Sequence, residues 1–362
     1  MDFFDYICSI NLKHQIMAKK SAKKSGKRRW LLWSGVVLAL LIGAAAIALN
    51  YGMSRHEGDD VWVYIPKDAT KSSVRDSLIS ALGEDEGELM YKFWQFQNGT
   101  VEGAHGAYKI ANGDMLSKSA RRMVYGMQTP VKVVWSNVRT FVGLAQKITS
   151  GLECTAEEFI AECDNVLAEN GFKPEEYSAA FLPDSYEFYW SVDANGLINK
   201  LLDYRNRFWN SGGRISKAKA LGLTKVQVAT LASIVEEETS KRDEMPLVAR
   251  LYLNRLQKEM KLQADPTVKF AAKDPSIRRI TKVHLKIESP YNTYLHYGLP
   301  PGPIRNVDSR TLDAVLNAPE HNYIFMCAKE DFSGYHNFAE DYDAHMANAR
   351  RYQAELNRRG IR

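Results

Sequence analysis

The longest apolar stretch of the chain lies close to its N-terminus. Residues Trp30 to Leu49 form twenty positions without a charged side chain, the length that an α-helix needs to cross the hydrocarbon core of a bilayer. Seven basic residues come just before it: Lys19, Lys20, Lys23, Lys24, Lys27, Arg28 and Arg29. This pattern predicts a cytoplasmic basic tail at 1–29, a membrane-spanning helix at 30–50, and the rest of the chain outside the membrane.

A cleaved signal peptide shares the combination of a charged start and an apolar core. The apolar run is long for a signal peptide, and AIALNYG is only a mediocre cleavage site, so the pattern favours an uncleaved anchor. Met17 is followed by AKKSAKK and makes a more ordinary start than the residues before it, so we expect the natural chain to begin there.

Short strand-like and helical patterns alternate from the apolar run to about residue 150. The strand-like segments are Val61–Pro66, Gly106–Ile110 and Val131–Ser136, and the helical ones are KSSVRDSLISALG and MLSKSARRMVYG. Elements of this size build small α+β modules that are typical of binding domains. We therefore expect residues 55–150 to form such a module.

From about Thr155 the pattern becomes mostly helical. The segment LTKVQVATLASIVEEET begins with capping-box spacing between Thr224 and Gln227, and another amphipathic helix is predicted from Met245 to Met260. The predicted C-terminal helices are SRTLDAVLNAP and Asp341–Arg359. The aromatic segment FLPDSYEFYW interrupts this pattern and is interpreted as a docking loop or a short strand.

Beyond Leu262 the chain is rich in loops. Pro300, Pro301 and Pro303 fall within four positions and produce a rigid, irregular backbone, which suits a polymer-binding groove as well as ordinary loop structure. The predicted fold class is therefore α+β, with a mixed helical domain and a loop-rich groove at 155–362.

The net charge of +5 resides in the N-terminal tail. Residues 1–29 hold eight basic and two acidic side chains, which leaves 40 basic and 41 acidic side chains at 30–362. The external part is thus essentially neutral, and the basic run is interpreted as a topology signal, with no nucleic-acid partner expected.

The four cysteines, Cys8, Cys154, Cys163 and Cys327, are too few to staple a fold of this size. Cys154 and Cys163 lie in what reads as one helical segment, and a continuous helix makes a bond between them geometrically doubtful. No Cys/His spacing suggests a zinc site, so we expect neither a metal nor an organic cofactor.

Glu238 is the strongest candidate for acid chemistry. On a helical wheel it falls in an apolar stripe formed by Val228, Leu231, Ile234 and Val235. Burial destabilises a carboxylate and raises its pKa, which keeps a glutamate protonated for general-acid catalysis. Glu237 and Glu236 lie on the more solvated side of the wheel. The alternative is that the stripe ends before Glu238 and all three acids form a solvated helix end.

Four motifs then give the chain a family resemblance: ASIVEEET, LYLNRLQKEMKLQADPTV, YNTYLHYGLPPGPI and YHNF. In order and spacing over roughly residues 181–340, they resemble the endolytic murein transglycosylases, the MltG or YceG-like family. The resemblance implies an enzyme anchored by one N-terminal helix in the bacterial inner membrane, which cuts peptidoglycan glycan strands outside it. It also implies a LysM-like, glycan-contacting subdomain from about Gly103 to Ser150.

The acidic positions of the family motif fall on Glu236 and Glu238. Lytic transglycosylases generally follow their catalytic glutamate with a small hydroxyl residue, and Thr239 follows Glu238. The helical wheel independently favours the same residue, so Glu238 is the predicted catalytic acid and Glu236 the alternative. The lysine that the family has between them is replaced by Glu237, a like charge expected to help raise a neighbour's pKa.

The resemblance also implies substrate-binding roles for Gln263, Asp265, Thr267, Tyr291, Asn292, Tyr294 and Pro301. Asp265 has an alternative as a turn or helix cap before Pro266, and the tyrosines have an alternative in core packing. Asn254 and Arg255 are expected to brace the site. His336 is left out of the catalytic set, because a lone histidine is more often structural.

The resemblance implies a lyase that cleaves the MurNAc-GlcNAc β-1,4 bond of nascent strands and leaves 1,6-anhydro-MurNAc ends, which limits strand length. The alternatives are a muramidase-type hydrolase, with Asp265 activating water, and a catalytically silent peptidoglycan-binding scaffold. The expected partners are peptidoglycan strands and the inner membrane, with peptidoglycan synthases or division proteins as further candidates.

Overall fold

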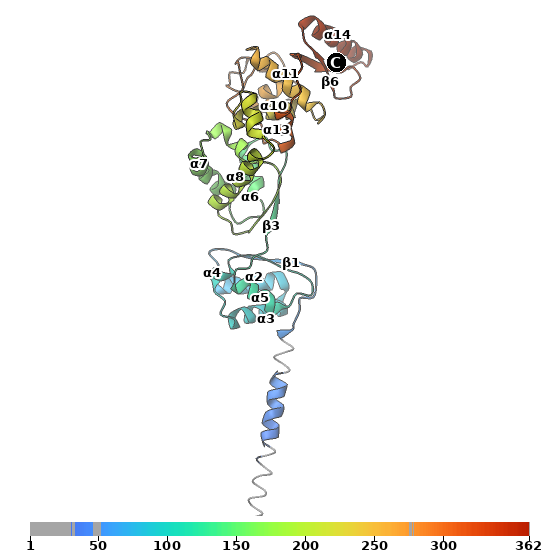
Figure 1. Cartoon of the computed structure of the whole chain (residues 1–362). Helices are drawn as coiled ribbons and strands as arrows, with labels where there is room; N and C mark the ends of the chain where they lie inside the picture. The colour runs from blue at the N-terminus through green and yellow to red at the C-terminus, as the bar shows by residue number, and fades with distance from the viewer. Residues whose placement is uncertain (1–29, 31–32, 46–51, 275–276, 278, 362) are drawn as a thin grey trace, which may run out of the picture. The chain divides into compact units, whose positions relative to one another are not determined.

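The computed structural model describes residues 30, 33–45, 52–274, 277 and 279–361. They divide into two compact units, the first ending at Thr129 and the second beginning at Pro130 (Figure 1). Part of the predicted membrane span is described as an apolar helix, Trp33–Ala45. The remainder of that span and the predicted basic tail lie almost wholly outside the described residues.

Within the described residues, no single helix combines the length and apolar composition that a membrane crossing requires. Two helices that follow each other at a sharp bend, α9 (Arg214–Ala220) and α10 (Lys225–Glu238), satisfy the criteria only when they are counted together.

The first unit is built on a two-stranded antiparallel sheet. Strand β1 (Val61–Ile65) pairs with β2 (Gly106–Ile110), and both strands lie where the alternating pattern predicts them. The helices that surround this sheet are α2 (Lys71–Leu82), α3 (Glu84–Phe96), α4 (Val101–Ala104) and α5 (Leu116–Val124). Apolar side chains of the sheet and of these helices form one core, so a small α+β module is present.

The sequence patterns predict α2 and α5 but not α3. A glycine inside α3, Gly87, weakens its helical signal, since glycine is a poor helix former. A Cβ atom at this position would lie 2.6 Å from the Cα of Ile79 in α2, so the close crossing of the two helices requires the glycine. A tertiary contact therefore accounts for a residue that makes the local pattern harder to read.

The second unit begins with β3 (Val131–Val134), which pairs antiparallel with β4 (Ser185–Phe188). The predicted strand in FLPDSYEFYW is therefore present. Helices α6 (Phe141–Thr149), α7 (Ala156–Glu169) and α8 (Ala194–Asn210) and the 3-10 helix η1 (Pro174–Ala180) contribute to the core beside this sheet. Because the partner strand of β3 lies some fifty residues later, β3 and α6 belong to this unit and not to the module before it.

Two of the cysteines lie at the start of this core. Cys154 comes just before Thr155, the N-cap of α7, and Cys163 lies inside the helix, so the helix is not continuous across both. Both thiols are free and buried. Burial raises the pKa of Cys154 to about 11 and that of Cys163 further still.

The second unit has another core, farther along the chain, and helix α10 lies at its centre. It packs against α11 (Met245–Gln257), α12 (Asp265–Ala272) and α13 (Ser309–Leu316). Figure 1 labels α11 and α13 beside it. The predicted capping box is present, with reciprocal bonds between Thr224 and Gln227. All residues from Val228 to Val235 are buried. The helix is thus buried all round over this stretch, where the wheel predicts only an apolar stripe.

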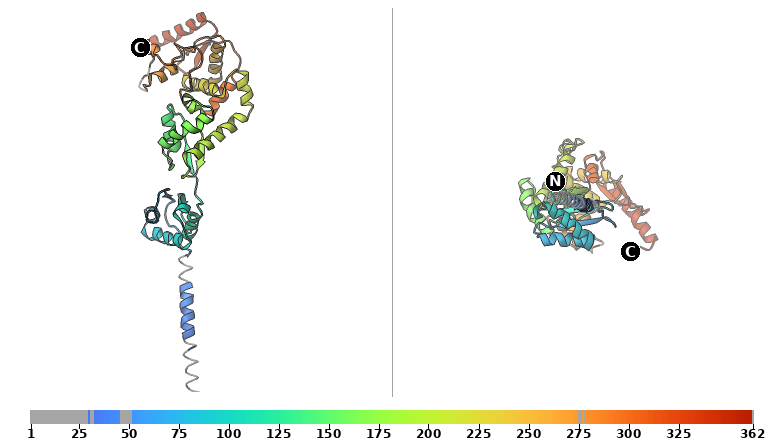
Figure 2. Two further views of the ribbon diagram at one scale, coloured as in Figure 1. Left: turned by 90° about the vertical axis from the view of Figure 1, so that its left-hand side faces the viewer. Right: turned by 90° about the horizontal axis from the view of Figure 1, so that it is seen from below.

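The C-terminal part of this unit holds a short hairpin and the last helix. Strands β5 (Phe325–Ala328) and β6 (His336–Ala339) pair antiparallel, and α14 (Tyr342–Arg358) packs against both (Figure 2). Between α12 and α13, the described residues contain one short regular element, the 3-10 helix η2 (His284–Lys286). The prediction of a mixed α+β fold is therefore confirmed, and the segment ESPYNTYLHYGLPPGPIRN is a loop as expected. The expectation of loops throughout the chain beyond Leu262 is wrong, because QADPTV runs into α12 and HNFA forms β6.

Candidate active site

Glu238 is the last residue of α10, and its carboxylate meets a buried tyrosine from the next helix. The hydroxyl of Tyr252 in α11 donates to Oε1 of Glu238 at 2.7 Å. Tyr252 is 2% exposed, whereas Glu238 remains partly exposed. The tyrosine therefore contacts the carboxyl group from the protein interior, and the carboxyl group keeps some access to solvent.

Burial raises the pKa of Glu238 from 4.5 to about 7. The hydrogen bond from Tyr252 opposes this rise, the negative charge of Asp265 adds to it, and His336 and Arg255 oppose it. A carboxyl group with a pKa near neutrality exists in both protonation states at physiological pH. Glu238 is thus suited to donate a proton and to accept one afterwards.

The other two glutamates of the motif are held by arginines. Glu236 lies 3.2 Å from Nη2 of Arg305 through one oxygen, and its second oxygen accepts from the backbone N–H of Asp308. Glu237 pairs with Arg305 at 2.9 Å and with Arg139 at 2.8 Å. The prediction that these two acids lie on a solvated face is wrong, because loops from distant parts of the chain cover this end of α10.

These ion pairs distinguish the three acids. Among the described residues, no Lys, Arg or His side chain forms an ion pair with Glu238, while both neighbours are paired. The nearby negative charge that contributes to the raised pKa of Glu238 comes from Asp265. Glu237 is not among the main causes of the raised pKa of Glu238, and its carboxylate pairs with two guanidinium groups.

Asp265 and Tyr294 form a second carboxylate–tyrosine pair. Asp265 is the first residue of α12 and is exposed, and it accepts a hydrogen bond from the hydroxyl of Tyr294 at 2.7 Å. Burial and the bonded carboxylate both raise the pKa of Tyr294, so its hydroxyl stays protonated and donates. Ala264 is the N-cap of α12 and no side chain caps this helix, so the alternative role of Asp265 as a helix cap is wrong, and its negative charge contributes to the raised pKa of Glu238.

Asn292 and Thr267 are buried, and their polar atoms are used inside the protein. Asn292 donates to the carbonyls of Leu285 and Ile287 and accepts from the backbone N–H of Tyr294. The Thr267 hydroxyl donates to a carbonyl at 2.7 Å and lies 2.8 Å from the hydroxyl of Thr293. Both residues are fully buried, so the structure gives them roles in shaping the loop in place of the predicted substrate contacts.

The remaining predicted groove residues lie nearer the surface. Gln263 is exposed and has a φ of 50°, a left-handed conformation stabilised by its N–H bond to the carbonyl of Thr293. Tyr291 is partly buried and its ring lies 4.7 Å from that of Phe270, as its core-packing alternative expects. Pro301 is exposed. Gln263 and Pro301 can therefore reach a ligand, and Tyr291 also serves the core.

Asn254 and Arg255 brace the site, as predicted. Asn254 donates to the carbonyls of His321 and Tyr323, and Arg255 donates to those of Ile324 and Leu262. These bonds connect α11 to the segments before α12 and β5. The loops around Glu238 are therefore held by the same helix that carries Tyr252.

His336 lies in β6 and is bonded to a buried glutamate. Its Nδ1 is 2.9 Å from Oε2 of Glu244, and its backbone N–H donates to Oε1 at 2.7 Å. The contacts are those of a structural residue, while its proximity to Glu238 gives it an electrostatic effect on that carboxyl group.

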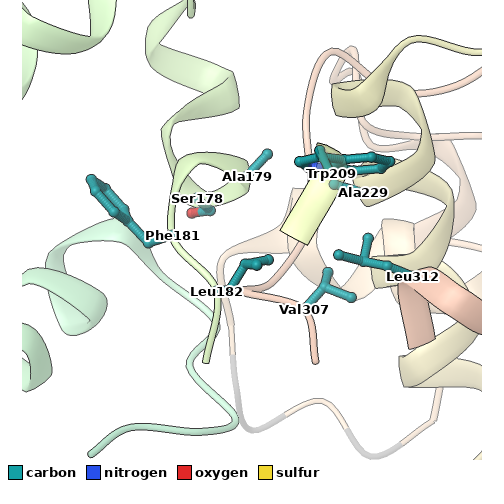
Figure 3. Close-up of a pocket in the computed structure, with 8 residues that line it drawn as sticks. All are labelled: Ser178, Ala179, Phe181, Leu182, Trp209, Ala229, Val307 and Leu312. Carbon is teal, nitrogen blue, oxygen red and sulfur yellow. The ribbon is translucent and has the colours of Figure 1, made fainter. Parts of the chain in front are cut away.

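Glu238 lines neither of two hollows that the described residues form, one at Leu182 and one at Met260. The cavity in Figure 3 has a volume of about 10 Å³ and is lined mainly by apolar side chains, among them Leu182, Trp209 and Leu312. It has room for about one water molecule, far too little for a sugar ring. In the described part of the chain, no three His, Cys, Asp or Glu side chains gather to hold a metal ion.

Tyr252 is the main residue that sequence reasoning missed. The sequence does contain an indication of its role, since a tyrosine within the apolar segment LYLNRL is expected to be buried and a buried tyrosine hydroxyl needs a polar partner. The helical pattern alone cannot identify that partner, which lies in the preceding helix.

Fold and site together define a class: mixed α+β proteins with one partly exposed, tyrosine-bonded glutamate suited to acid–base chemistry. A model of the YceG-like family matches residues 63–351, and the chain belongs to this family. This chain is 40% identical to the endolytic murein transglycosylase of Bacillus subtilis (strain 168) over 105 residues. The matched region covers 29% of each protein.

A second relative is the endolytic murein transglycosylase of Streptococcus pneumoniae serotype 2, strain D39. It is 31% identical over 174 residues, which cover 46% of this chain and 31% of the relative. The matched regions thus span less than a third of both curated relatives. A crystal structure of a YceG-like protein from Listeria monocytogenes matches the fold with a TM-score of 0.51 at 21% identity, over 80% of this chain and 99% of that one.

Proposed function

We propose that this protein is an endolytic lytic transglycosylase. It would cleave the MurNAc-GlcNAc β-1,4 bond within nascent peptidoglycan strands, leave 1,6-anhydro-MurNAc ends and so limit strand length. The observation that carries the proposal is Glu238: a partly exposed carboxyl group with a pKa of about 7, bonded to Tyr252, while both neighbouring glutamates are paired with arginines. The names of the relatives support the same reaction.

A single glutamate suffices for this reaction. Protonated Glu238 gives its proton to the glycosidic oxygen as the bond from that oxygen to C1 breaks and its electron pair goes to the leaving sugar. The C6 hydroxyl oxygen of the same MurNAc then bonds to C1, and its proton goes to the Glu238 carboxylate. The acid is regenerated and no water is consumed, which makes the enzyme a lyase. Attack within one sugar has a high effective molarity, so no second carboxylate is required.

The predicted groove residues that keep some exposure are proposed to bind the strand. Gln263 and Asp265 can hydrogen-bond to hydroxyl and N-acetyl groups, Tyr294 can contact a sugar face, and Pro301 can form part of the groove wall. Tyr291 is retained at the edge of this groove because its ring is only partly buried. Glu236 is the alternative acid in this proposal.

The location of this activity is proposed to be the outer side of the bacterial inner membrane. Residues 30–50 would form a single-pass anchor with a cytoplasmic N-terminus, and residues 155–362 would form the catalytic domain outside. In support, the helix Trp33–Ala45 is apolar and its side chains are exposed, with Leu40 at 68% and Ile42 at 61%. Lipid would cover this surface.

Glycan contact by the predicted module, of which the first unit holds residues 55–129, is part of the same proposal, as is its LysM-like character. Its support is the small α+β unit built on β1 and β2. Peptidoglycan synthases or division proteins are candidate partners of the anchor and the cytoplasmic tail.

The test is mass spectrometry of the products formed when the full chain, in detergent, digests uncrosslinked glycan strands. We expect anhydro-ended fragments from the wild type and from Glu236→Gln, and none from Glu238→Gln. Loss of product with a folded Glu236→Gln alone would move the acid to Glu236. Reducing ends would instead support a muramidase-type hydrolase, and intact strands would support a silent scaffold.

A further inference from the structure

The Glu238 carboxyl group has two oxygens, and the structure treats them differently. Oε1 accepts the hydroxyl of Tyr252 at 2.7 Å from the buried side. Oε2 has no protein donor among the described residues. Since a carboxylic acid carries one proton on one of its oxygens, the two oxygens are not equivalent in catalysis.

We propose that Tyr252 is a positioning residue that reserves Oε2 of Glu238 for the proton exchanged with the substrate. The inference rests on the proposed transglycosylase reaction and specifies which oxygen performs it. Tyr252 is 2% exposed and therefore does not reach the glycan itself. Its effect passes through Glu238.

The chemistry of the tyrosine fixes the direction of this hydrogen bond. Burial and the adjacent carboxyl group raise the pKa of Tyr252 well above its ordinary value, so the hydroxyl stays protonated. It therefore donates a hydrogen bond to Oε1 in both protonation states of Glu238. When Glu238 is protonated, Oε1 acts as the acceptor and the acid proton resides on Oε2. When Glu238 is ionised, the same bond keeps the carboxylate in place to accept the C6 hydroxyl proton on Oε2.

The bond to Tyr252 also sets how strongly Glu238 holds its proton. A hydrogen bond to the ionised form stabilises that form and lowers the pKa, in opposition to burial. The other charged or titratable groups that interact with this carboxyl group are Arg255 of α11, Asp265 of α12, His336 of β6 and Tyr294 of the loop after η2. A change made only at the Tyr252 hydroxyl leaves all of these in place.

The experiment measures the ionisation of Glu238 directly, in the full chain in detergent. Glutamate labelled with carbon-13 at the carboxyl carbon gives one titrating resonance that is absent from Glu238→Gln. We expect Tyr252→Phe to raise the pKa of Glu238 by about one pH unit, because a bond to the charged form is lost. The alkaline limb of the kcat/KM profile should move upward by the same amount, since the free enzyme must be protonated to act.

The kinetic constants should separate positioning from general damage. We expect Tyr252→Phe to lower kcat about tenfold, because the acid is weaker and its proton is shared between both oxygens, with KM unchanged. The matched control is Tyr177→Phe, which removes another buried hydroxyl bonded to a carboxylate, Asp164, at 3.1 Å. It should change neither the Glu238 pKa nor the pH profile.

A second variant covers the case in which Tyr252→Phe does not fold. Incorporating 3-fluorotyrosine at position 252 keeps the hydroxyl in place and makes it a stronger donor, so the Glu238 pKa should fall. An unchanged Glu238 pKa in the folded variants would overturn the role of Tyr252. Absence of anhydro product from the wild type would instead overturn the proposed function, and the two failures are distinguishable because the resonance is read without substrate.

Discussion

Replacing Glu238 by glutamine should make the folded protein more stable at alkaline pH while it removes the acid. In the folded state, burial holds the pKa of Glu238 at about 7, compared with an ordinary value of 4.5. At about 1.4 kcal/mol for each pH unit, this difference corresponds to roughly 3 kcal/mol of unfolding free energy. Glutamine has no charge to bury, and its carbonyl oxygen can still accept the bond from Tyr252.

The sign follows from proton binding in the two states. Below pH 4.5 Glu238 is protonated in both the folded and the unfolded state, so it does not change the unfolding free energy. As the pH rises from 4.5 to 7, the unfolded chain releases its proton and the folded chain retains it, so wild-type stability falls. The stability advantage of Glu238→Gln should therefore grow from about 1 kcal/mol near pH 5 to about 3 kcal/mol near pH 8.

The assay is urea unfolding of the wild type and Glu238→Gln at pH 5, 6.5 and 8, followed by tryptophan fluorescence. Glu236→Gln is the matched control, because the same chemical change there weakens the ion pair with Arg305 and should destabilise the protein at pH 8. A Glu238→Gln variant that is no more stable than the wild type at pH 8 would refute the reasoning. Its carboxylate would then be solvated or paired in the folded state.

Two further substitutions test the loops around the site. Arg305→Met should lower the unfolding free energy by about 3 kcal/mol, because it leaves two partly buried glutamates without their shared guanidinium; a loss below about 1 kcal/mol in urea unfolding would contradict this. Gly302→Ala should cost about 1–3 kcal/mol, since the added Cβ would lie 1.9 Å from the carbonyl oxygen of Glu175, and it should lower Tm. Gly52→Ala is its control, because no heavy atom lies within 4 Å of the added Cβ, and an equal Tm for the two variants would count against the proposed overlap.

Much of the local structure could be read from the chain. Thr224 caps the start of α10 through the predicted capping box, because the donors and acceptors of a helix start lie within four residues of one another. Strand β1 lies where the alternating pattern predicts it, for the same local reason. The sequence places β3 in the first module, whereas in the structure β3 pairs with β4 of the second unit. Strand pairing depends on residues that are distant in the sequence, so the local pattern does not predict it.

The candidate acid illustrates the same division. The sequence by itself identified the three glutamates at the end of α10, favoured Glu238 and indicated an apolar environment for it, since these depend on helical periodicity. Only the tertiary structure decided that Arg305 occupies the other two acids and that Tyr252 bonds the third. An ion pair or a hydrogen bond forms wherever folding brings charges and donors together, and helical periodicity carries no information about residues that lie outside the helix.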